Sequence, residues 1–125
     1  MDIALNTLEL AILTEIVSAY QEKYTPIQAH LNGIVVKSRT KTKTGMCIQF
    51  DYAKPIAPLT KEGDLLEALL TADKVVQLPS LTNGLGFVLD IAAGLFDTLD
   101  IYTNKDEKWD GDFTGFELVV KNTPS

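Results

Sequence analysis

The chain holds one cysteine, one histidine and one tryptophan in 125 residues. With only Cys47 and His30 available, an intramolecular disulfide is excluded, and zinc fingers and His-based relays are disfavoured. No run reaches about 18 uncharged apolar residues, so no membrane-spanning helix is predicted. No set of residues specifies a reaction, so we expect no catalytic site, no metal site and no cofactor. These absences favour a soluble, cytoplasmic, non-enzymatic protein of a reducing compartment.

The charge of the chain is acidic overall and unevenly distributed. Asp and Glu number 17 against 11 Lys and Arg, which gives a net charge of −6. Residues 23–61 nevertheless hold most of the basic side chains, with acidic segments on both sides. The acidic balance disfavours nucleic acid as a partner, and the basic segment favours an acidic protein.

Hydrophobic periodicity predicts a single α+β domain over residues 1–125, with a frayed or disordered tail from about residue 122. Asn6 and Glu9 form a capping-box pattern, and apolar residues at helical spacing then predict an amphipathic helix at about 7–23. We expect this helix to pack on the apolar face of a five- or six-stranded antiparallel sheet built from hairpins. The shorter predicted elements are a helical turn ending at Asn32-Gly33, a helix at about 65–72, a strand at 74–78 and a strand at 116–121.

The central hairpin is predicted over residues 86–103. Ala92-Ala93-Gly94 is typical of a three-residue loop in which Gly94 takes a left-handed conformation. That loop sets Leu89 opposite Asp97 and places this carboxylate in the middle of an apolar face. We predict a structural role for Asp97 as an acceptor from a cap, a loop or Arg39, so that Asp97→Ala would destabilise the fold.

An earlier hairpin carries alternating basic residues. Lys43-Thr44-Gly45 predicts a second three-residue loop, which would pair Thr42 with Met46. Period-two alternation then places four basic residues on one face of the first strand, the basic strip of Lys37, Arg39, Lys41 and Lys43. This strip is our predicted partner-binding site, and the alternative is that its charges protect a sheet edge. A homodimer is a further alternative, because an exposed sheet edge can pair with a second copy of the chain.

Two acidic groups offer alternative functions. Asp97, Asp100 and Tyr102, with Asp90 nearby, could serve a small-ligand-binding or hydrolytic protein, because an environment that separates carboxylate pKa values permits acid-base work. Residues 106–117 match much of the EF-hand calcium-loop pattern, but Lys108 stands at a ligand position and the flanks are predicted strands. His30 is interpreted as a packing or surface residue and Cys47 as an inert thiol.

Several segments resemble a group of small bacterial proteins for which no activity is established. The matching residues cover somewhat more than half of the chain and are Ser38-Arg39, Thr42, Gly45-Met46, Phe50, Asn83-Gly84, Gly86-Phe87, Leu89, Gly94, Asp97, Leu99-Asp100, Tyr102-Thr103 and Trp109. Thr40-Lys41 and Lys43 depart from the pattern of that group, so the basic strip is partly particular to this chain. The resemblance implies a bacterial origin and an α+β domain, and it implies no activity.

Overall fold

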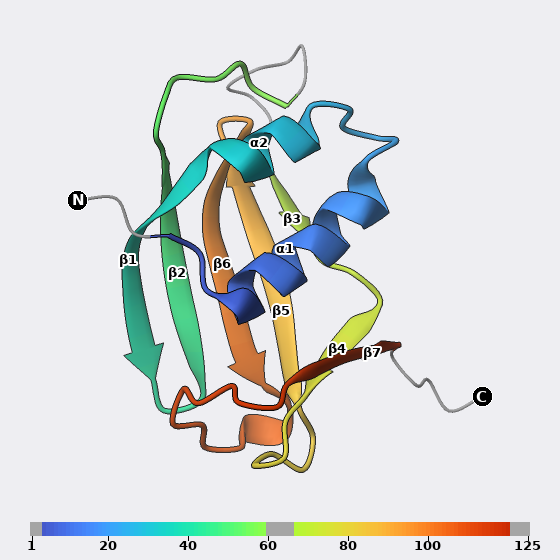
Figure 1. Cartoon of the computed structure of the whole chain (residues 1–125), viewed down its shortest axis with the longest axis vertical. Helices are drawn as coiled ribbons and strands as arrows, with labels where there is room; N and C mark the ends of the chain where they lie inside the picture. The colour runs from blue at the N-terminus through green and yellow to red at the C-terminus, as the bar shows by residue number, and fades with distance from the viewer. Residues whose placement is uncertain (1–3, 60–66, 121–125) are drawn as a thin grey trace.

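The computed structural model describes residues 4–59 and 67–120, which form two helices and a seven-stranded antiparallel sheet (Figure 1). The helices are α1 (Thr7–Tyr20) and α2 (Ile27–Gly33). The strands are β1 (Ile34–Thr42), β2 (Gly45–Tyr52), β3 (Ala68–Leu70), β4 (Lys74–Gln77), β5 (Leu85–Ala92), β6 (Leu95–Thr103) and β7 (Glu117–Val120), and a short 3-10 turn, η2 (Asn104–Asp106), follows β6. The predicted α+β class is confirmed, and the sheet has more strands than the sequence indicates. The predicted tail from about residue 122 lies outside the described residues.

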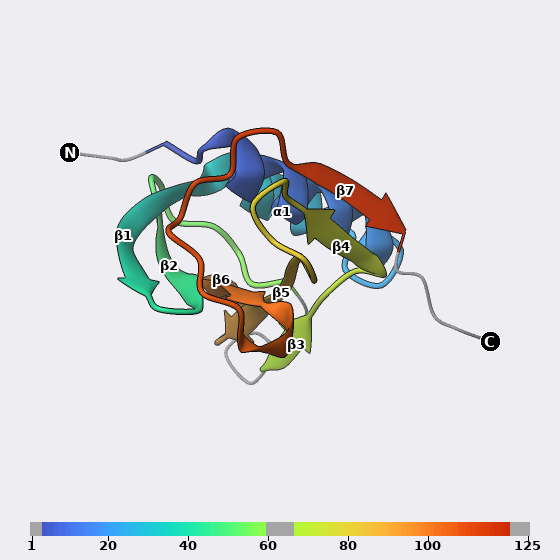
Figure 2. The same cartoon turned by 90° about the horizontal axis from the view of Figure 1, so that it is seen from below.

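The strands follow the order β1-β2-β6-β5-β4-β7, with β3 paired to β5 beside β4. Two hairpins, β1-β2 and β5-β6, make up the larger part of the sheet, and β2 joins them by pairing with β6. Both helices lie on the same side of this sheet (Figures 1 and 2). Strands β4 and β7 turn out of its plane toward that side (Figure 2). Within residues 4–59 and 67–120, no helix covers the opposite face of the two hairpins.

Helix α1 begins at the predicted capping box. The Glu9 amide donates to the Asn6 side chain at 2.8 Å, and the Asn6 amide donates to the Glu9 carboxylate at 2.9 Å. The helix ends at Tyr20, earlier than the predicted residue 23. Its buried apolar residues belong to the same core as the inward-facing residues of β5 and β6, including Leu8, Ile12, Leu13, Ile16, Phe87, Leu89 and Leu99.

The β5-β6 hairpin has a two-residue loop rather than three. Ala93 and Gly94 both have positive φ, 55° and 74°, the conformation of the type I′ turn that suits the twist of paired strands. The shorter loop and a register shift between Asp90 and Ile91 together pair Leu89 with Leu99, so the predicted pairing of Leu89 with Asp97 is wrong. A register shift accommodates Asp97 as an extra residue in β6 and turns Phe96 into the core.

The β1-β2 hairpin also has a two-residue loop, Lys43-Thr44, so Thr42 pairs with Gly45 and not with Met46. Gly45 is not in the left-handed region, and its role differs from the predicted one. A Cβ at this position would clash with the carbonyl oxygen of Ile101 on β6. Glycine is required here for close approach of two strands rather than for the turn.

Residues 68–70 form β3, so a helix across them is wrong. The short apolar run is ambiguous between helix and strand, and pairing of Ala68 with Ile91 and of Leu70 with Leu89 decides it. The rest of the predicted helix, as far as residue 66, lies outside the described residues. Within the part of the chain that the structure describes, no helix is long and apolar enough to cross a membrane.

Candidate functional site

The basic strip is divided by a β-bulge in β1. Val36 pairs with Phe50 but Ser38 pairs with Gln49, so the register shifts by one residue at Lys37. Beyond the shift Arg39 pairs with the buried Ile48, and Lys41 pairs with Met46. A one-residue shift moves all following side chains to the opposite face of a strand. The prediction that the four basic residues share one face is therefore wrong, whereas their role in binding stays a prediction.

Arg39 is held by Glu9 of helix α1. Its Nε donates to Glu9 Oε2 at 2.6 Å and its Nη2 to Glu9 Oε1 at 2.7 Å, a two-pronged ion pair, and Nη2 also donates to the Ala4 carbonyl at 3.0 Å. The Glu9 side chain is 2 % exposed and the Arg39 side chain 28 %. Hydrogen bonding to Glu9 raises the pKa of Arg39. The capping pattern located Glu9 in the sequence, but no local signal revealed its pairing with a residue thirty positions later.

The segment after β6 is fastened to the β1-β2 turn. The Thr103 amide donates to the Thr44 carbonyl at 2.8 Å, and the Trp109 amide donates to the Lys43 carbonyl at 3.1 Å. The indole N–H of Trp109 donates to the Asp112 carbonyl at 2.9 Å, and the Lys41 ammonium lies 5.6 Å from the indole ring centroid. These contacts bury Trp109 and fix it beside the end of strand β1.

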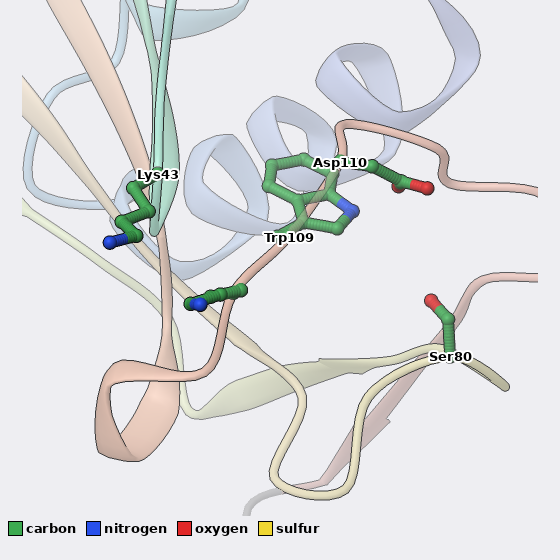
Figure 3. Close-up of a pocket in the computed structure, with 5 residues that line it drawn as sticks. Lys43, Ser80, Trp109 and Asp110 are labelled. Atoms are coloured by element: carbon green, nitrogen blue, oxygen red, sulfur yellow. The ribbon is translucent and has the colours of Figure 1, made fainter.

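A shallow depression opens beside Trp109, with a volume of about 400 Å³. We call it the Trp109 pocket, and its lining residues are Lys43, Ser80, Lys108, Trp109 and Asp110. They come from three separate segments, with Ser80 on the segment that faces the loop carrying Trp109 and Asp110 (Figure 3). Lys43 belongs to the basic strip, but Ser80 and Lys108 gave no sequence signal for this role, because only the fold brings them together.

Three acidic residues of the loop accept hydrogen bonds within it or from its neighbours. The Glu107 carboxylate accepts the amides of Thr82 and Asn83, and these bonds lower its pKa. The Asp110 side chain accepts the Asp112 amide at 2.9 Å. In turn, the Asp112 side chain accepts the hydroxyl and amide of Thr114, which lower the pKa of Asp112.

The same loop does not gather calcium ligands. Among residues 4–59 and 67–120, no three His, Cys, Asp or Glu side chains are placed to hold a metal ion. Strand β7 follows the loop, where an EF-hand needs a helix. The geometry therefore gives no support to the calcium alternative for residues 106–117.

The carboxylates of β5 and β6 lie on the face of the sheet opposite the two described helices. Asp97 is exposed at the bulge, where its carboxylate accepts the Thr98 hydroxyl at 3.0 Å, so its predicted place in the apolar face is wrong. Asp100 and Tyr102 are exposed on the same strand and do not line the Trp109 pocket. Partial burial and repulsion from Asp97 raise the pKa of Asp90. The prediction that Asp97, Asp100 and Tyr102 serve a ligand stays untested.

Cys47 pairs with Asp100 across β2 and β6. Burial is the largest effect that raises the pKa of the Cys47 thiol. Hydrogen bonding to Asp100 and repulsion from the Asp100 carboxylate raise it further. A raised pKa keeps the thiol protonated, the unreactive form.

His30 is fully buried within a hydrogen-bonded network. Its Nε2 donates to the Ala57 carbonyl at 2.9 Å, which leaves Nδ1 to accept the Tyr52 hydroxyl at 2.7 Å. The Tyr52 oxygen in turn accepts the Phe96 amide at 2.8 Å. Burial lowers the pKa of His30 and raises that of Tyr52 to about 12. This neutral network joins α2 to both hairpins and supports the interpretation of His30 as a packing residue.

Comparison with protein-family models, curated proteins and solved structures gives no match for this chain. The resemblance to small bacterial proteins stays a prediction. The candidate site therefore depends on the geometry of the Trp109 pocket and the lysines around it.

Proposed function

We propose that the protein is a small non-enzymatic binding protein that holds an acidic protein partner at a basic surface. This basic surface consists of Lys41, Lys43 and Lys108, which are exposed at the end of strand β1, on its turn and on the loop docked against that turn. Lys37 is left out because the bulge places it on the opposite face of β1 from Lys41. Arg39 is left out of the proposed contact because Glu9 occupies its guanidinium.

The observation that carries the proposal is that Lys43 and Lys108 line one pocket and that neither makes an ion pair within the described residues. The ion pair of Arg39 with Glu9 is the one found in the described part of the chain. Next to these lysines, both carboxylate oxygens of Glu107 and one of Asp110 accept backbone amides. Lysines without partners on an acidic protein offer charge complementarity to an acidic surface.

A protein partner is favoured over nucleic acid by the surroundings of the same lysines. Nucleic-acid sites are strongly basic over an extended stripe, because they neutralise a run of phosphates. Here the loop that supplies Lys108 also carries Asp106, Asp110 and Asp112, and the whole chain has a net charge of −6. Such a mixed surface fits a protein whose acidic groups are spaced to match individual lysines.

The proposal is tested by affinity capture from a lysate of the source cells with two charge-reversal variants. Lys41→Glu, Lys43→Glu and Lys108→Glu together alter the basic surface. The matched control reverses the same number of charges away from it, with Lys23→Glu, Lys54→Glu and Lys74→Glu. Each variant loses one lysine-aromatic contact, that of Lys41 with Trp109 in the first and that of Lys23 with Tyr24 in the control.

We expect one acidic protein, retained near stoichiometrically at low salt, to be lost by the first variant and kept by the control. Binding should weaken as salt rises, since exposed charges are screened over about 8–10 Å at physiological ionic strength. Equal retention by both folded variants, or no capture by the native chain at low salt, would contradict the proposal.

A further inference from the structure

The Trp109 pocket is surrounded by hydrogen-bond donors that the fold leaves unused. Within the described residues, the Lys43 and Lys108 ammonium groups and the Ser80 hydroxyl donate no side-chain hydrogen bond. Nearby donors are satisfied, because the indole N–H of Trp109 donates to the Asp112 carbonyl and the Thr103 hydroxyl donates to the Glu107 carbonyl. Two ammonium groups without a partner at the edge of one pocket suit an anionic group that enters from outside.

The lining distinguishes between anions. Phosphate sites commonly combine a planar Arg fork or free backbone amides with their positive charge. Here the backbone amides of Trp109 and Asp112 are already bonded, and the lining has no arginine. The Asp110 carboxylate lies in the same lining, and its repulsion is greater for a dianion than for a singly charged group. A carboxylate fits this mixed lining better than a phosphate does.

We infer that the Trp109 pocket receives one carboxylate side chain, an Asp or Glu of the acidic protein partner. The carboxylate would accept from the Lys43 and Lys108 ammonium groups. This inference rests on the proposed function and names the group that the basic surface recognises.

The pocket is arranged before any partner arrives. The hydrogen bond from the Trp109 amide to the Lys43 carbonyl holds the loop that carries Lys108 and Asp110 against the β1-β2 turn, and the indole hydrogen bond to the Asp112 carbonyl fixes the loop internally. A Cβ at Gly111, where φ is +91°, would lie 3.4 Å from Cε of Lys41, so this part of the loop packs directly on the lysine stem. A preformed site loses less conformational entropy on binding.

The only tryptophan of the chain lines the pocket, which provides a local signal for the test. An N-acetylated, C-amidated tetraglutamate peptide is titrated at low salt while the indole N–H resonance of Trp109 is followed by ¹H-¹⁵N NMR. Lys43→Gln with Lys108→Gln is the pocket variant, and Lys23→Gln with Lys54→Gln is the control of equal charge. Inorganic phosphate at matched ionic strength is the second probe.

We expect a saturable shift of the Trp109 resonance with the peptide. The pocket variant should bind about tenfold more weakly, since it loses two charge pairs that are each weak when exposed to solvent, and the control should bind as the native protein does. Equal binding by the two variants, or no peptide-induced shift at Trp109, overturns the inference. A saturable response to phosphate but not to the peptide also overturns it.

The inference and the proposed function fail separately. If a captured partner depends on the basic surface but is retained by the Lys43→Gln, Lys108→Gln variant, the pocket is not its anchor and the proposed function stands. If no partner is captured while tetraglutamate binds at Trp109, the pocket is an anion site outside the proposed function.

Discussion

The two hairpins each have a glycine at the end of the predicted loop, but their turns differ in backbone conformation. In both, a three-residue loop ending in glycine is predicted, and in both the loop has two residues and a bulge shifts the register in one strand. Ala93-Gly94 has positive φ at both positions, whereas Lys43-Thr44 has it at neither. The carbonyls of Lys43 and Thr44 are instead occupied by Trp109 and Thr103. One turn is determined by its own backbone, and the other is supported by a distant segment.

The bulges also send polar residues in opposite directions. In β6 the extra residue, Asp97, is exposed and the strand keeps its apolar face with Phe96 and Leu99. In β1 the shift at Lys37 turns Arg39 toward the side of α1, where Glu9 receives it. The comparison teaches that a bulge can remove a charge from the core or bring one against it, and that the available partner decides which.

The largest expected effect concerns the glycines of the two turns. Gly45→Ala should lower the free energy of unfolding by about 3 kcal/mol, because its Cβ would overlap the backbone of Ile101, which cannot move aside as a side chain could. Gly94→Ala should cost about 1 kcal/mol, the strain of a left-handed alanine. Urea unfolding monitored by circular dichroism measures both.

Gly33→Ala is the control for this pair, since its Cβ would meet Cδ2 of Tyr52 at an ordinary 3.7 Å. We expect it to leave stability unchanged or slightly raised, because alanine restricts the unfolded chain. If Gly94→Ala proved more destabilising than Gly45→Ala, the assignment of close strand approach to Gly45 and of left-handed conformation to Gly94 would not explain the relative sizes of the two effects.

Local patterns predicted what depends on local physics. The capping box at Asn6, the amphipathic period of α1 and the alternation in β1 and β5 each identified an element, since neighbouring residues determine them. Both bulges were missed. For β6 a signal existed in the spacing of Phe96 and Leu99, which is three where strict alternation gives two. For β1 no apolar residue after Val36 marked the change of face.

The candidate site was predicted only in part for the same reason. Lys43 stood out through alternation with its basic neighbours, and it lies in the Trp109 pocket. Ser80 and Lys108 come from segments that meet it only after β4 and β6 are in place. The pairing of Glu9 with Arg39 depends on the contact of a helix with a strand after the bulge. None of these juxtapositions has a periodic signature in the sequence.

The second expected effect concerns the charge that the β1 bulge turns inward. Arg39→Met leaves the buried Glu9 carboxylate without its partner and should cost about 2 kcal/mol, less than the 3–5 kcal/mol of a fully buried pair because Arg39 is 28 % exposed. Combining it with Glu9→Gln, which can retain the capping box, should restore part of the loss. Urea unfolding of both single variants and the double variant measures the coupling, and purely additive losses would mean that the ion pair contributes nothing.

A smaller effect is expected from pH at the network that links the hairpins. Burial lowers the pKa of His30 in the folded chain, so below about pH 6.5 the unfolded chain binds a proton that the folded chain resists. Protonation would also place a hydrogen on Nδ1, which now accepts the hydrogen bond from the Tyr52 hydroxyl, so that two donors would face each other. Stability should therefore fall as pH decreases below 6.5, and less steeply in His30→Gln. Urea unfolding between pH 5 and 7.5 tests this, and parallel pH profiles for the two proteins would refute it.

The smallest expected effect belongs to the charge that the β6 bulge expels. Asp97→Asn should change the free energy of unfolding by less than about 0.5 kcal/mol, since Asp97 is exposed, in contrast to the destabilisation that a place in the apolar face would imply. The same substitution should lower the pKa of Asp90, because Asp97 repels its ionised form. Carboxyl-carbon NMR titration of Asp90 reports that change independently of stability. A loss of stability as large as that of Arg39→Met would mean that Asp97 is part of the core, and the two bulges would then not differ in where they place a charge.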